Sequence, residues 1–386
     1  MRVAVVGSGI GGLCAAVGLQ RAGAEVVVFE KAQDPCPGGS GLSVFGNGIR
    51  ALESLGLGAG FRAITDAKAA SFRGGQRRPD GSWLSVYPMD VLTELRVVDR
   101  AELHELLTSS LAPGTVSAGQ RVASASEEAS VRYAGADERA EAERFDLVIG
   151  ADGLRSAVRG LWPEDPGVVY AGYSTWRGIT ERPMDLGGEA GETWGAGRRF
   201  GVAPLADGRV YWFAVATMPE PSRSRGETPL DRTFGTWHAP IADLVAATAA
   251  DRVQFLPIEE LGGRLQSYVR GRTVLLGDAA HAMTPNLGQG GGQAMEDAAT
   301  LVALLAPSAA AERPDPTSLT RALERYDALR RPRSQGIARR SRLVGKLAHG
   351  RGPVASRVGG MILAATPRAV LHRQLTWLQS WTPPGA

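Results

Sequence analysis

The sequence predicts an α/β fold in which a Rossmann-type domain is interleaved with an antiparallel-sheet domain and followed by C-terminal helices. Three observations predict it. A glycine-rich turn, Gly7–Gly12, directly follows a valine-rich strand and opens a helix. Two later segments, Asp146–Gly153 and Gly277–His281, each place a glycine and an aspartate after a short apolar strand. Stretches between these segments alternate apolar and polar residues, which is typical of antiparallel strands.

The first segment has the parts of a phosphate-binding turn. Arg2–Val6 has the length and valine content of a buried parallel strand, and Leu13–Gly23 is a predicted helix. Gly7 permits the tight turn, Gly9 lets the backbone approach a pyrophosphate, and Gly12 lets the helix pack on the strand. The helix N-terminus adds free N–H groups and the positive end of its dipole. We therefore expect this turn to hold a dinucleotide.

A second valine-rich strand, Glu25–Phe29, leads to Glu30 and Lys31. An acidic residue about 20 residues beyond the glycine turn is placed to bind ribose hydroxyls. A carboxylate here also argues against a ribose 2′-phosphate, because two anionic groups would repel each other. The alternative is a glycine-rich strand–turn–helix without a ligand, which the combination of strand, helix and acid disfavours.

The second segment repeats this arrangement without the glycine fingerprint. Phe145–Ala151 is a predicted buried strand, and Asp152 and Gly153 form the turn at its carboxyl end. Ligands of open α/β sheets collect at such strand ends. A new helix is predicted to follow, carrying Arg155, Ser156 and Arg159.

The third segment places another carboxylate at a strand end. Thr273–Leu276 is a predicted strand that delivers Asp278 to its carboxyl end, and Met283–Gln293 is a proline- and glycine-rich loop. A helix is predicted from about residue 293 to 305, so the glycines before it leave N–H groups free to stabilise negative charge. Taken singly, each Gly–Asp or Asp–Gly pair most often marks only a turn.

In this order and at these separations, the three segments resemble those of the single-component FAD-dependent aromatic hydroxylases, which have the para-hydroxybenzoate hydroxylase-like fold. Asp146–Arg159 is similar to the second motif of that family, and Gly277–Pro285 with Gly288–Gly290 is similar to the third. The resemblance extends from Arg2 to about Arg340.

Arg100 matches the arginine that reaches the phosphate and ribose region of the flavin in this family. A purely structural interpretation is also open for this segment. Asp99 and Glu102 form a predicted capping box that starts a helix at Arg100.

The resemblance implies a Rossmann-type FAD-binding domain that holds FAD non-covalently. It places Glu30 at the adenosine ribose, Asp278 at the ribityl or ribose side, and the loop 288–292 at the pyrimidine edge of the isoalloxazine. The candidate cofactor-binding residues are Gly7, Gly9, Gly11, Gly12, Glu30, Lys31, Arg100, Asp152, Asp278, Pro285, Gly288, Gly290 and Gly291.

The implied reaction is a monooxygenation. NADH or NADPH reduces FAD, O₂ adds at the flavin C4a position, and one oxygen is transferred to a small electron-rich aromatic or heteroaromatic substrate. The flavin supplies the difficult chemistry, so we expect no Ser/His/Asp triad. A second GxGxxG turn is absent from the sequence, so the nicotinamide coenzyme is expected to bind transiently.

The chain of 386 residues is long enough for two or three domains. We expect a discontinuous FAD-binding domain (1–70, 100–165 and 266–345), a substrate domain (71–99 and 166–265) and a C-terminal helical segment (346–386). Strands are predicted in 191–205 and 209–217, a polar loop in 219–229, and a packed amphipathic helix in 361–381.

Composition argues against several other classes of protein. The net charge of +3 is small and comes mostly from arginine, so no nucleic-acid partner is expected. The arginine-dense stretch 325–342 is interpreted as a solvated helix face. Cys14 and Cys36 are expected to be reduced thiols in a cytoplasmic protein, and the five histidines lack metal-ligand spacing. No stretch is apolar enough to span a membrane. Monomer and homodimer both stay open.

Arg199 and Tyr211 are the candidate catalytic residues. If their segments form two neighbouring strands, both side chains can face the flavin. With the segment Pro37–Gly48, this pattern is most similar to the bacterial FAD-dependent urate hydroxylases and their zeaxanthin-epoxidase-like relatives. Arg199 and Tyr211 match the arginine and tyrosine that hold and activate urate in the urate enzymes. One residue departs from that pattern, since Asn286 stands where the urate enzymes carry an aspartate. We therefore expect an anionic phenolic or specialised-metabolite ring beside Arg199, ahead of urate. The alternative is a strand-end cation and a core tyrosine.

Other functions stay open from the sequence alone. A nicotinamide dehydrogenase would leave the second and third segments without a purpose. A flavin-dependent epoxidase or reductase acting on an isoprenoid or specialised-metabolite double bond shares this fold, and a non-catalytic flavoprotein would bind ligand without oxidising coenzyme. A flavin halogenase is disfavoured because the segment around Trp176 lacks the paired tryptophans of that class.

Overall fold

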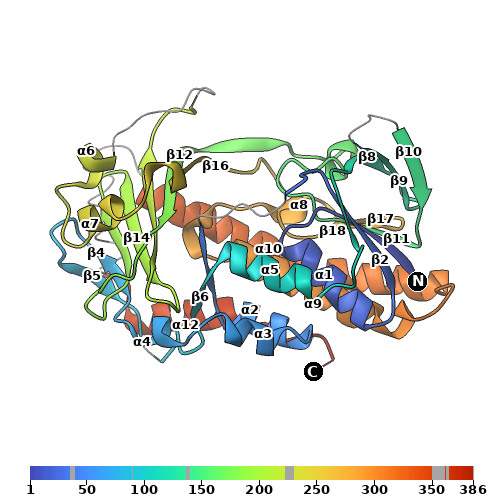
Figure 1. Cartoon of the computed structure of the whole chain (residues 1–386), viewed down its shortest axis with the longest axis horizontal. Coiled ribbons are helices and arrows are strands. Elements are labelled where there is room, and N and C mark those ends of the chain that lie inside the picture. The colour runs from blue at the N-terminus through green and yellow to red at the C-terminus, as the bar shows by residue number, and fades with distance from the viewer. Residues whose placement is uncertain are drawn as a thin grey trace.

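The computed structural model of the chain describes residues 1–34, 40–88, 90–135, 140–221, 230–349, 361 and 365–385 (Figure 1). Cys36, residues 37–39 of the segment compared with the urate hydroxylases, and residues 222–229 of the predicted polar loop lie outside this part. Two sheets occupy opposite ends of the molecule, and the long strands β12 and β16 run between them along one edge (Figure 1).

The first sheet has six strands in the order β17-β18-β11-β1-β2-β7 and is parallel except for β17. Its strands are β1 (Arg2–Val6), β2 (Glu25–Glu30), β7 (Val116–Ala118), β11 (Leu147–Gly150), β17 (Val269–Arg270) and β18 (Thr273–Leu275). The register aligns Val6 with Gly150 and Gly150 with Leu275. The carboxyl ends of β1, β11 and β18 therefore lie side by side, which brings the three glycine-containing segments to one edge of the sheet.

Helices pack around this sheet and against one another. They are α1 (Ile10–Arg21), α2 (Gly46–Ser54), α3 (Gly58–Ala63), α5 (Arg100–Ser109), α8 (Asp278–His281), α9 (Gly290–Ala309) and α10 (Pro316–Ala348). In α1, Leu13 and Val17 are completely buried in the main hydrophobic core. A small sheet of β8 (Arg121–Ala125), β9 (Ser130–Ala134) and β10 (Ala140–Arg144) lies beside β2, where Phe29 contacts Tyr133 with ring centroids 4.7 Å apart.

The second sheet has seven strands in the order β16-β12-β15-β14-β13-β4-β5. They are β4 (Gly75–Arg77), β5 (Trp83–Val86), β12 (Val168–Ile179), β13 (Gly191–Gly195), β14 (Arg198–Pro204), β15 (Val210–Thr217) and β16 (Gln254–Leu261), and α6 (Leu230–Phe234) and α7 (Ile241–Ala246) pack nearby. Phe200 stacks on the fully buried Trp212 in a separate core. All seven strands come from 71–99 and 166–265, the segments that we assigned to a substrate domain.

Within 71–99 one strand departs from that division. Strand β6 (Arg96–Asp99) does not join the seven-stranded sheet but pairs with β3 (Gly41–Val44), close to α2. The chain therefore returns to the first domain a few residues before the predicted boundary at residue 100. The short helix α4 (Lys68–Ser71) lies at the earlier boundary, where the chain passes from the first domain to the segment assigned to the substrate domain.

Two helix predictions need correction. The helix predicted after Gly153 is wrong, because the Asp152 carboxylate accepts a hydrogen bond from the Ala157 amide at 2.7 Å and closes a turn, and only a 3-10 turn, Arg159–Leu161, follows. Helix α9 begins at Gly290, three residues before the predicted start, because three successive glycines adopt helical geometry there.

The interpretation of 325–342 as a solvated helix face is also wrong in part. These residues lie in the 33-residue helix α10, and Arg330 is only 1% exposed. It points inward to Glu296 and Asp297 of α9, so one stripe of this arginine-rich helix is part of the interior.

The C-terminal helix α12 (Arg368–Gln379) and the residues that follow it pack on the molecule, with Leu378 buried. The Arg340 guanidinium lies 3.6 Å from the centroid of the Trp377 ring, and Trp381 is buried in the main core.

In the described part of the chain, no helix has the length and hydrophobicity needed to cross a membrane. Cys14 is a free thiol, and burial raises its pKa to about 12.

Candidate active site

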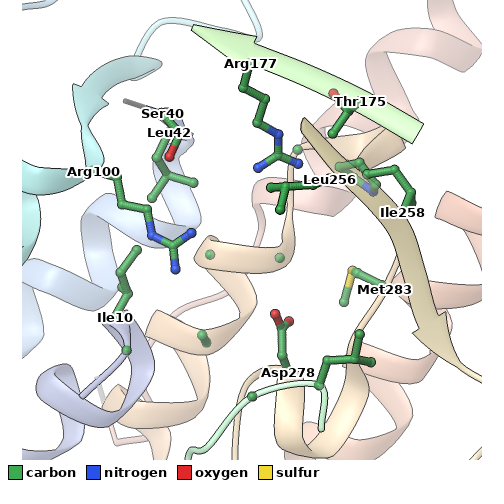
Figure 2. Close-up of a pocket in the computed structure, with 18 of the residues that line it drawn as sticks. Ile10, Ser40, Leu42, Arg100, Thr175, Arg177, Leu256, Ile258, Asp278 and Met283 are labelled. Carbon is green, nitrogen blue, oxygen red and sulfur yellow. The ribbon is translucent and has the colours of Figure 1, made fainter. Parts of the chain in front are cut away.

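A cavity of about 460 Å³ lies between the carboxyl ends of the six-stranded sheet and one face of the seven-stranded sheet. Its lining includes Gly9, Arg100, Gly153, Arg177, Arg199, Tyr211, Phe213, Leu256, Asp278, Met283, Pro285, Gly288, Gly290 and Gly291. Figure 2 shows side chains from the seven-stranded sheet, from β3 and from helices α1, α5 and α8 around this space. The three glycine segments and the predicted catalytic pair thus meet in one cavity.

The turn after β1 has the geometry that its glycines require. Gly7 has φ +103°, a conformation that side chains rarely adopt, and a Cβ on Gly12 would lie 2.1 Å from the Gly7 carbonyl oxygen. By contrast, a Cβ on Gly9, Gly153 or Gly290 would meet no atom within 4 Å. These three glycines expose their backbone to open space in the cavity, so a ligand can approach the main chain there directly.

A second cavity of about 240 Å³ continues from the first, with which it shares Gly9, Ala151 and Gly153. It is lined by Glu30 and Lys31, and also by Gln120 and Arg121. The two cavities form a channel that runs from Glu30 past the glycine turn to the loop before α9. Such a channel suits a long, bent dinucleotide.

Glu30 holds the glycine turn in place. Its carboxylate accepts hydrogen bonds from the Ser8 amide at 2.9 Å, the Ser8 hydroxyl at 2.7 Å and the Ala32 amide at 2.8 Å. Partial burial opposes ionisation, but these hydrogen bonds together with Lys31 lower the pKa of Glu30. The carboxylate is therefore charged at neutral pH and ties β2 to the turn after β1.

The second and third segments are joined by Arg159. Its guanidinium, 2% exposed, donates to the carbonyl oxygen of Ala279 in α8 at 2.9 Å and to that of Leu154 at 2.6 Å. Asp165 accepts a further hydrogen bond at 2.8 Å. The arginine thereby fixes the start of α8, which carries Asp278, against the turn that follows β11.

Asp278 and Arg100 point into the cavity from different elements (Figure 2). Asp278 is the first residue of α8, and its carboxylate makes no hydrogen bond with any described residue. Arg100 begins α5 as predicted, but the helix is capped by Asp99 alone, which accepts from the Ala101 amide at 3.0 Å. Both charged groups are therefore available to a ligand.

The register of the seven-stranded sheet puts Arg199 and Tyr211 on the same face. Arg199 of β14 lies opposite Val215 of β15, and Tyr211 lies four residues from Val215 on the same strand. Side chains alternate across a strand, so all three point to one face. Both predicted catalytic residues line the cavity.

The Arg199 guanidinium is not a free cation. It is 1% exposed and bonds to the Glu192 carboxylate at 3.3 Å and to the Asn286 side-chain oxygen at 2.5 Å. We expected it to hold an anionic ring, but Glu192 already balances its charge. The pair forms a neutral, rigid part of the cavity wall.

Asn286 lies behind this wall and not among the residues that line the cavity. Its amide nitrogen donates to the Ser341 carbonyl oxygen at 2.9 Å and also contacts the hydroxyls of Tyr173 and Thr284. Because a backbone carbonyl oxygen can only accept, the amide orientation is fixed, with its oxygen toward Arg199.

The glycine start of α9 rests on a buried polar network. Asn47 donates to Gln289 at 3.0 Å and to Glu296 at 2.6 Å, and Arg330 bonds to Glu296 and to Asp297. Burial by itself raises the pKa of both carboxyls. Interactions with Arg330 lower the pKa of Glu296, and interactions with His281 and Arg330 lower that of Asp297, so that each lies below its usual value. Among the described residues no cluster suits a metal ion.

Comparisons with known proteins agree with this arrangement. The family described as FAD binding domain matches residues 1–341. The chain is 35% identical over 357 residues to the aurachin C monooxygenase/isomerase of Stigmatella aurantiaca, covering 90% of this chain and 89% of that protein. It is 32% identical over 368 residues to the FAD-dependent urate hydroxylase of Klebsiella pneumoniae subsp. pneumoniae, covering 91% of each. The chain belongs to the FAD-dependent aromatic hydroxylases.

A solved structure shows the same fold throughout. The crystal structure of Klebsiella pneumoniae HpxO complexed with FAD and uric acid matches with a TM-score of 0.85 at 27% identity, covering 100% of this chain and 98% of that one. The predicted resemblance, the α/β fold and the assignment as an FAD-dependent monooxygenase are thus confirmed. The chain is therefore an FAD-binding protein, and the open glycine backbone along its own channel fits that cofactor.

Several cavity residues of this hydroxylase escaped the sequence analysis. Arg177 of β12 lies opposite Phe213 of β15, and Leu256 and Ile258 come from β16. The alternation within β12 is a signal that could have identified Arg177, because Thr175 and Arg177 share a face. Glu192 carried no such signal, since its pairing with Arg199 depends on strand register.

Proposed function

We propose that this chain hydroxylates a planar phenolic or hydroxylated N-heteroaromatic ring, bound between the flavin channel and the face of the seven-stranded sheet. The continuity of the two regions carries the proposal. The glycine-lined channel opens into the space below Tyr211, Phe213 and Val215 without an intervening wall. A ring in that space would lie beside the part of the cofactor held by the loop before α9.

The residues that would hold FAD follow the channel. Glu30 and Lys31 would hold the adenosine end, Gly9 and Arg100 the pyrophosphate, and Asp278 the ribityl chain, since these residues line the two cavities in this order. When bound and reduced by NADH or NADPH, FAD activates O₂ and supplies the oxygen atom. The N-terminus of α9 directs free N–H groups toward the cavity, where they stabilise negative charge.

Tyr211 would orient the ring through its hydroxyl. Burial raises the pKa of Tyr211, while the nearby charges of Arg177 and Arg100 lower it by less. The phenol therefore keeps its proton at neutral pH and donates a hydrogen bond to an oxygen or nitrogen on the ring. Leu42, Phe213 and Leu256 add apolar surface to this region, which would limit the access of water to the reacting atoms once the ring is bound.

The names of the relatives indicate several ring substrates. One relative is a urate hydroxylase, and a Streptomyces cremeus protein 34% identical to this chain is named a 3-amino-4-hydroxybenzoate 2-monooxygenase. Urate is not the favoured substrate here, because Asn286 is turned away from the cavity and bonded behind Arg199. The coenzyme requirement and the free Cys14 thiol support a cytoplasmic location.

The substrate class is tested by adding candidate rings to the purified holoenzyme and following NADH and NADPH oxidation together with peroxide release. Phenols and hydroxylated N-heteroaromatics should accelerate coenzyme oxidation with little peroxide, and urate should not. Fast, coupled oxidation with urate and none with the phenols would contradict the proposal.

A further inference from the structure

Arg177 is the cation of this cavity that the family motifs leave without a role. It lies two residues before the end of β12, opposite Phe213 of β15 on one side and Gln254 of β16 on the other. Its half-buried side chain points from β12 into the cavity, with the guanidinium near Leu256 in this view (Figure 2). The guanidinium makes no hydrogen bond or ion pair with any described residue.

The other charged residues that line the cavity are either paired within the protein or lie on the part expected to hold FAD, as Arg100 and Asp278 do. The Arg199 guanidinium is balanced by Glu192 at 3.3 Å, and Glu259 pairs with Arg155 at 2.7 Å. Arg100 begins α5 beside the phosphate end of the channel. Arg177 is therefore left as a cation at the substrate end of the cavity without a counter-charge from the described protein.

The surroundings of Arg177 make an unpaired charge costly once a ligand fills the space. Leu42, Phe213 and Leu256 supply apolar surface around it. A guanidinium that loses its water to such a surface needs an anionic or strongly polar partner from the ligand. Its planar donors suit a carboxylate, which accepts two parallel hydrogen bonds.

We propose that Arg177 is a specificity-determining residue that binds a carboxylate substituent on the ring substrate. The proposal rests on the proposed function for the place of the ring, because Tyr211 lies on the same sheet face, diagonal to Arg177 across β12 and β15. A ring carrying a hydroxyl and a carboxylate would be held at both groups, the first by Tyr211 and the second by Arg177. Arg199, which is paired with Glu192, would form part of the cavity wall and would not bind the carboxylate of the substrate.

Binding of two dead-end ligands to the oxidised holoenzyme tests this assignment without turnover. Benzoate and benzamide have similar shape but differ in charge, and each is titrated while the visible spectrum of the bound flavin is followed. Charge-assisted hydrogen bonds to a carboxylate predict that Arg177→Gln weakens benzoate binding by about 10- to 100-fold. Benzamide binding should be unchanged, and Arg177→Lys should recover part of the loss. Arg252→Gln removes a surface guanidinium and serves as the matched control, with no effect on either ligand.

Four results would overturn the assignment. They are failure of the wild type to bind benzoate, equal weakening of benzoate and benzamide, loss of FAD from Arg177→Gln, and a raised KM for NADH or NADPH with benzoate binding unchanged. The last two would indicate that Arg177 binds the flavin cofactor or a phosphate group of the nicotinamide coenzyme instead. If phenols fail as substrates but benzoate binding still depends on Arg177, the proposed function is wrong and the carboxylate site stands.

Discussion

Asn286→Asp tests whether the amide holds Arg199 from behind or faces the substrate. The urate hydroxylases that this chain resembles carry an aspartate at this position. In this chain the amide nitrogen donates to the Ser341 carbonyl oxygen at 2.9 Å, while the amide oxygen accepts from Arg199 at 2.5 Å. An aspartate keeps the second interaction but places a carboxylate oxygen against a carbonyl oxygen that can only accept.

Two effects then act in the same direction. The Ser341 carbonyl loses a hydrogen bond in a fully buried position, which costs about 1–3 kcal/mol. The Arg199 and Glu192 pair, neutral as it stands, would also acquire an extra negative charge. We expect Asn286→Asp to lower stability by about this amount and to be no more stable than Asn286→Ala.

The assay is thermal unfolding followed by the fluorescence of released FAD, with urate-dependent NADH oxidation measured on the same samples. The variant should unfold several degrees below wild type and gain no activity with urate. An unchanged midpoint, or coupled oxidation of urate by the variant, would refute the position that we assign to Asn286.

Two further predictions concern the cofactor and the interior. Asp278→Ala removes one charge-assisted hydrogen bond to a ribityl or ribose hydroxyl, so FAD affinity should fall by about one to two decades with the fold retained. FAD affinity is measured by diluting the holoenzyme and following the fluorescence of released FAD. If the variant binds FAD as tightly as wild type, Asp278 contributes only to the turn. Arg330→Met leaves the buried carboxylates of Glu296 and Asp297 without their shared cation and should cost about 3–5 kcal/mol. Because both carboxyl pKa values lie below their unfolded values in wild type, the stability they contribute is complete above about pH 4 and is lost as pH falls through the folded values. In the variant the pKa values of these carboxyls should rise toward or above their unfolded values, so the loss of stability on acidification should shrink or reverse. Thermal midpoints that fall in parallel with wild type on acidification would argue against the network.

The parts of the fold that could be predicted from the sequence are those set by local chemistry. Strand β1, the turn at Gly7–Gly12 and the start of α5 at Arg100 each follow from neighbouring residues. The meeting of three distant segments could also be inferred, because parallel strands present their carboxyl ends at one edge of a sheet.

What could not be predicted depends on contacts between distant residues. The neutral pair of Arg199 and Glu192 arises from the register of β13 and β14, which no local pattern specifies. The inward turn of Arg330 depends on the rotational phase of α10 against α9. The turn closed by the Asp152 carboxylate replaced a helix, because a side chain captured backbone N–H groups that a helix would have used.

Oxygen transfer is the central claim for this protein, and isotope labelling tests it most directly. A ring that accelerates coenzyme oxidation by the yellow holoenzyme is incubated under ¹⁸O₂, and the product is examined by mass spectrometry. The account predicts that each product molecule gains one ¹⁸O atom, that FAD is released by acid, and that no product forms without O₂. Product formed under anaerobic conditions, or a hydroxyl derived from water, would contradict it.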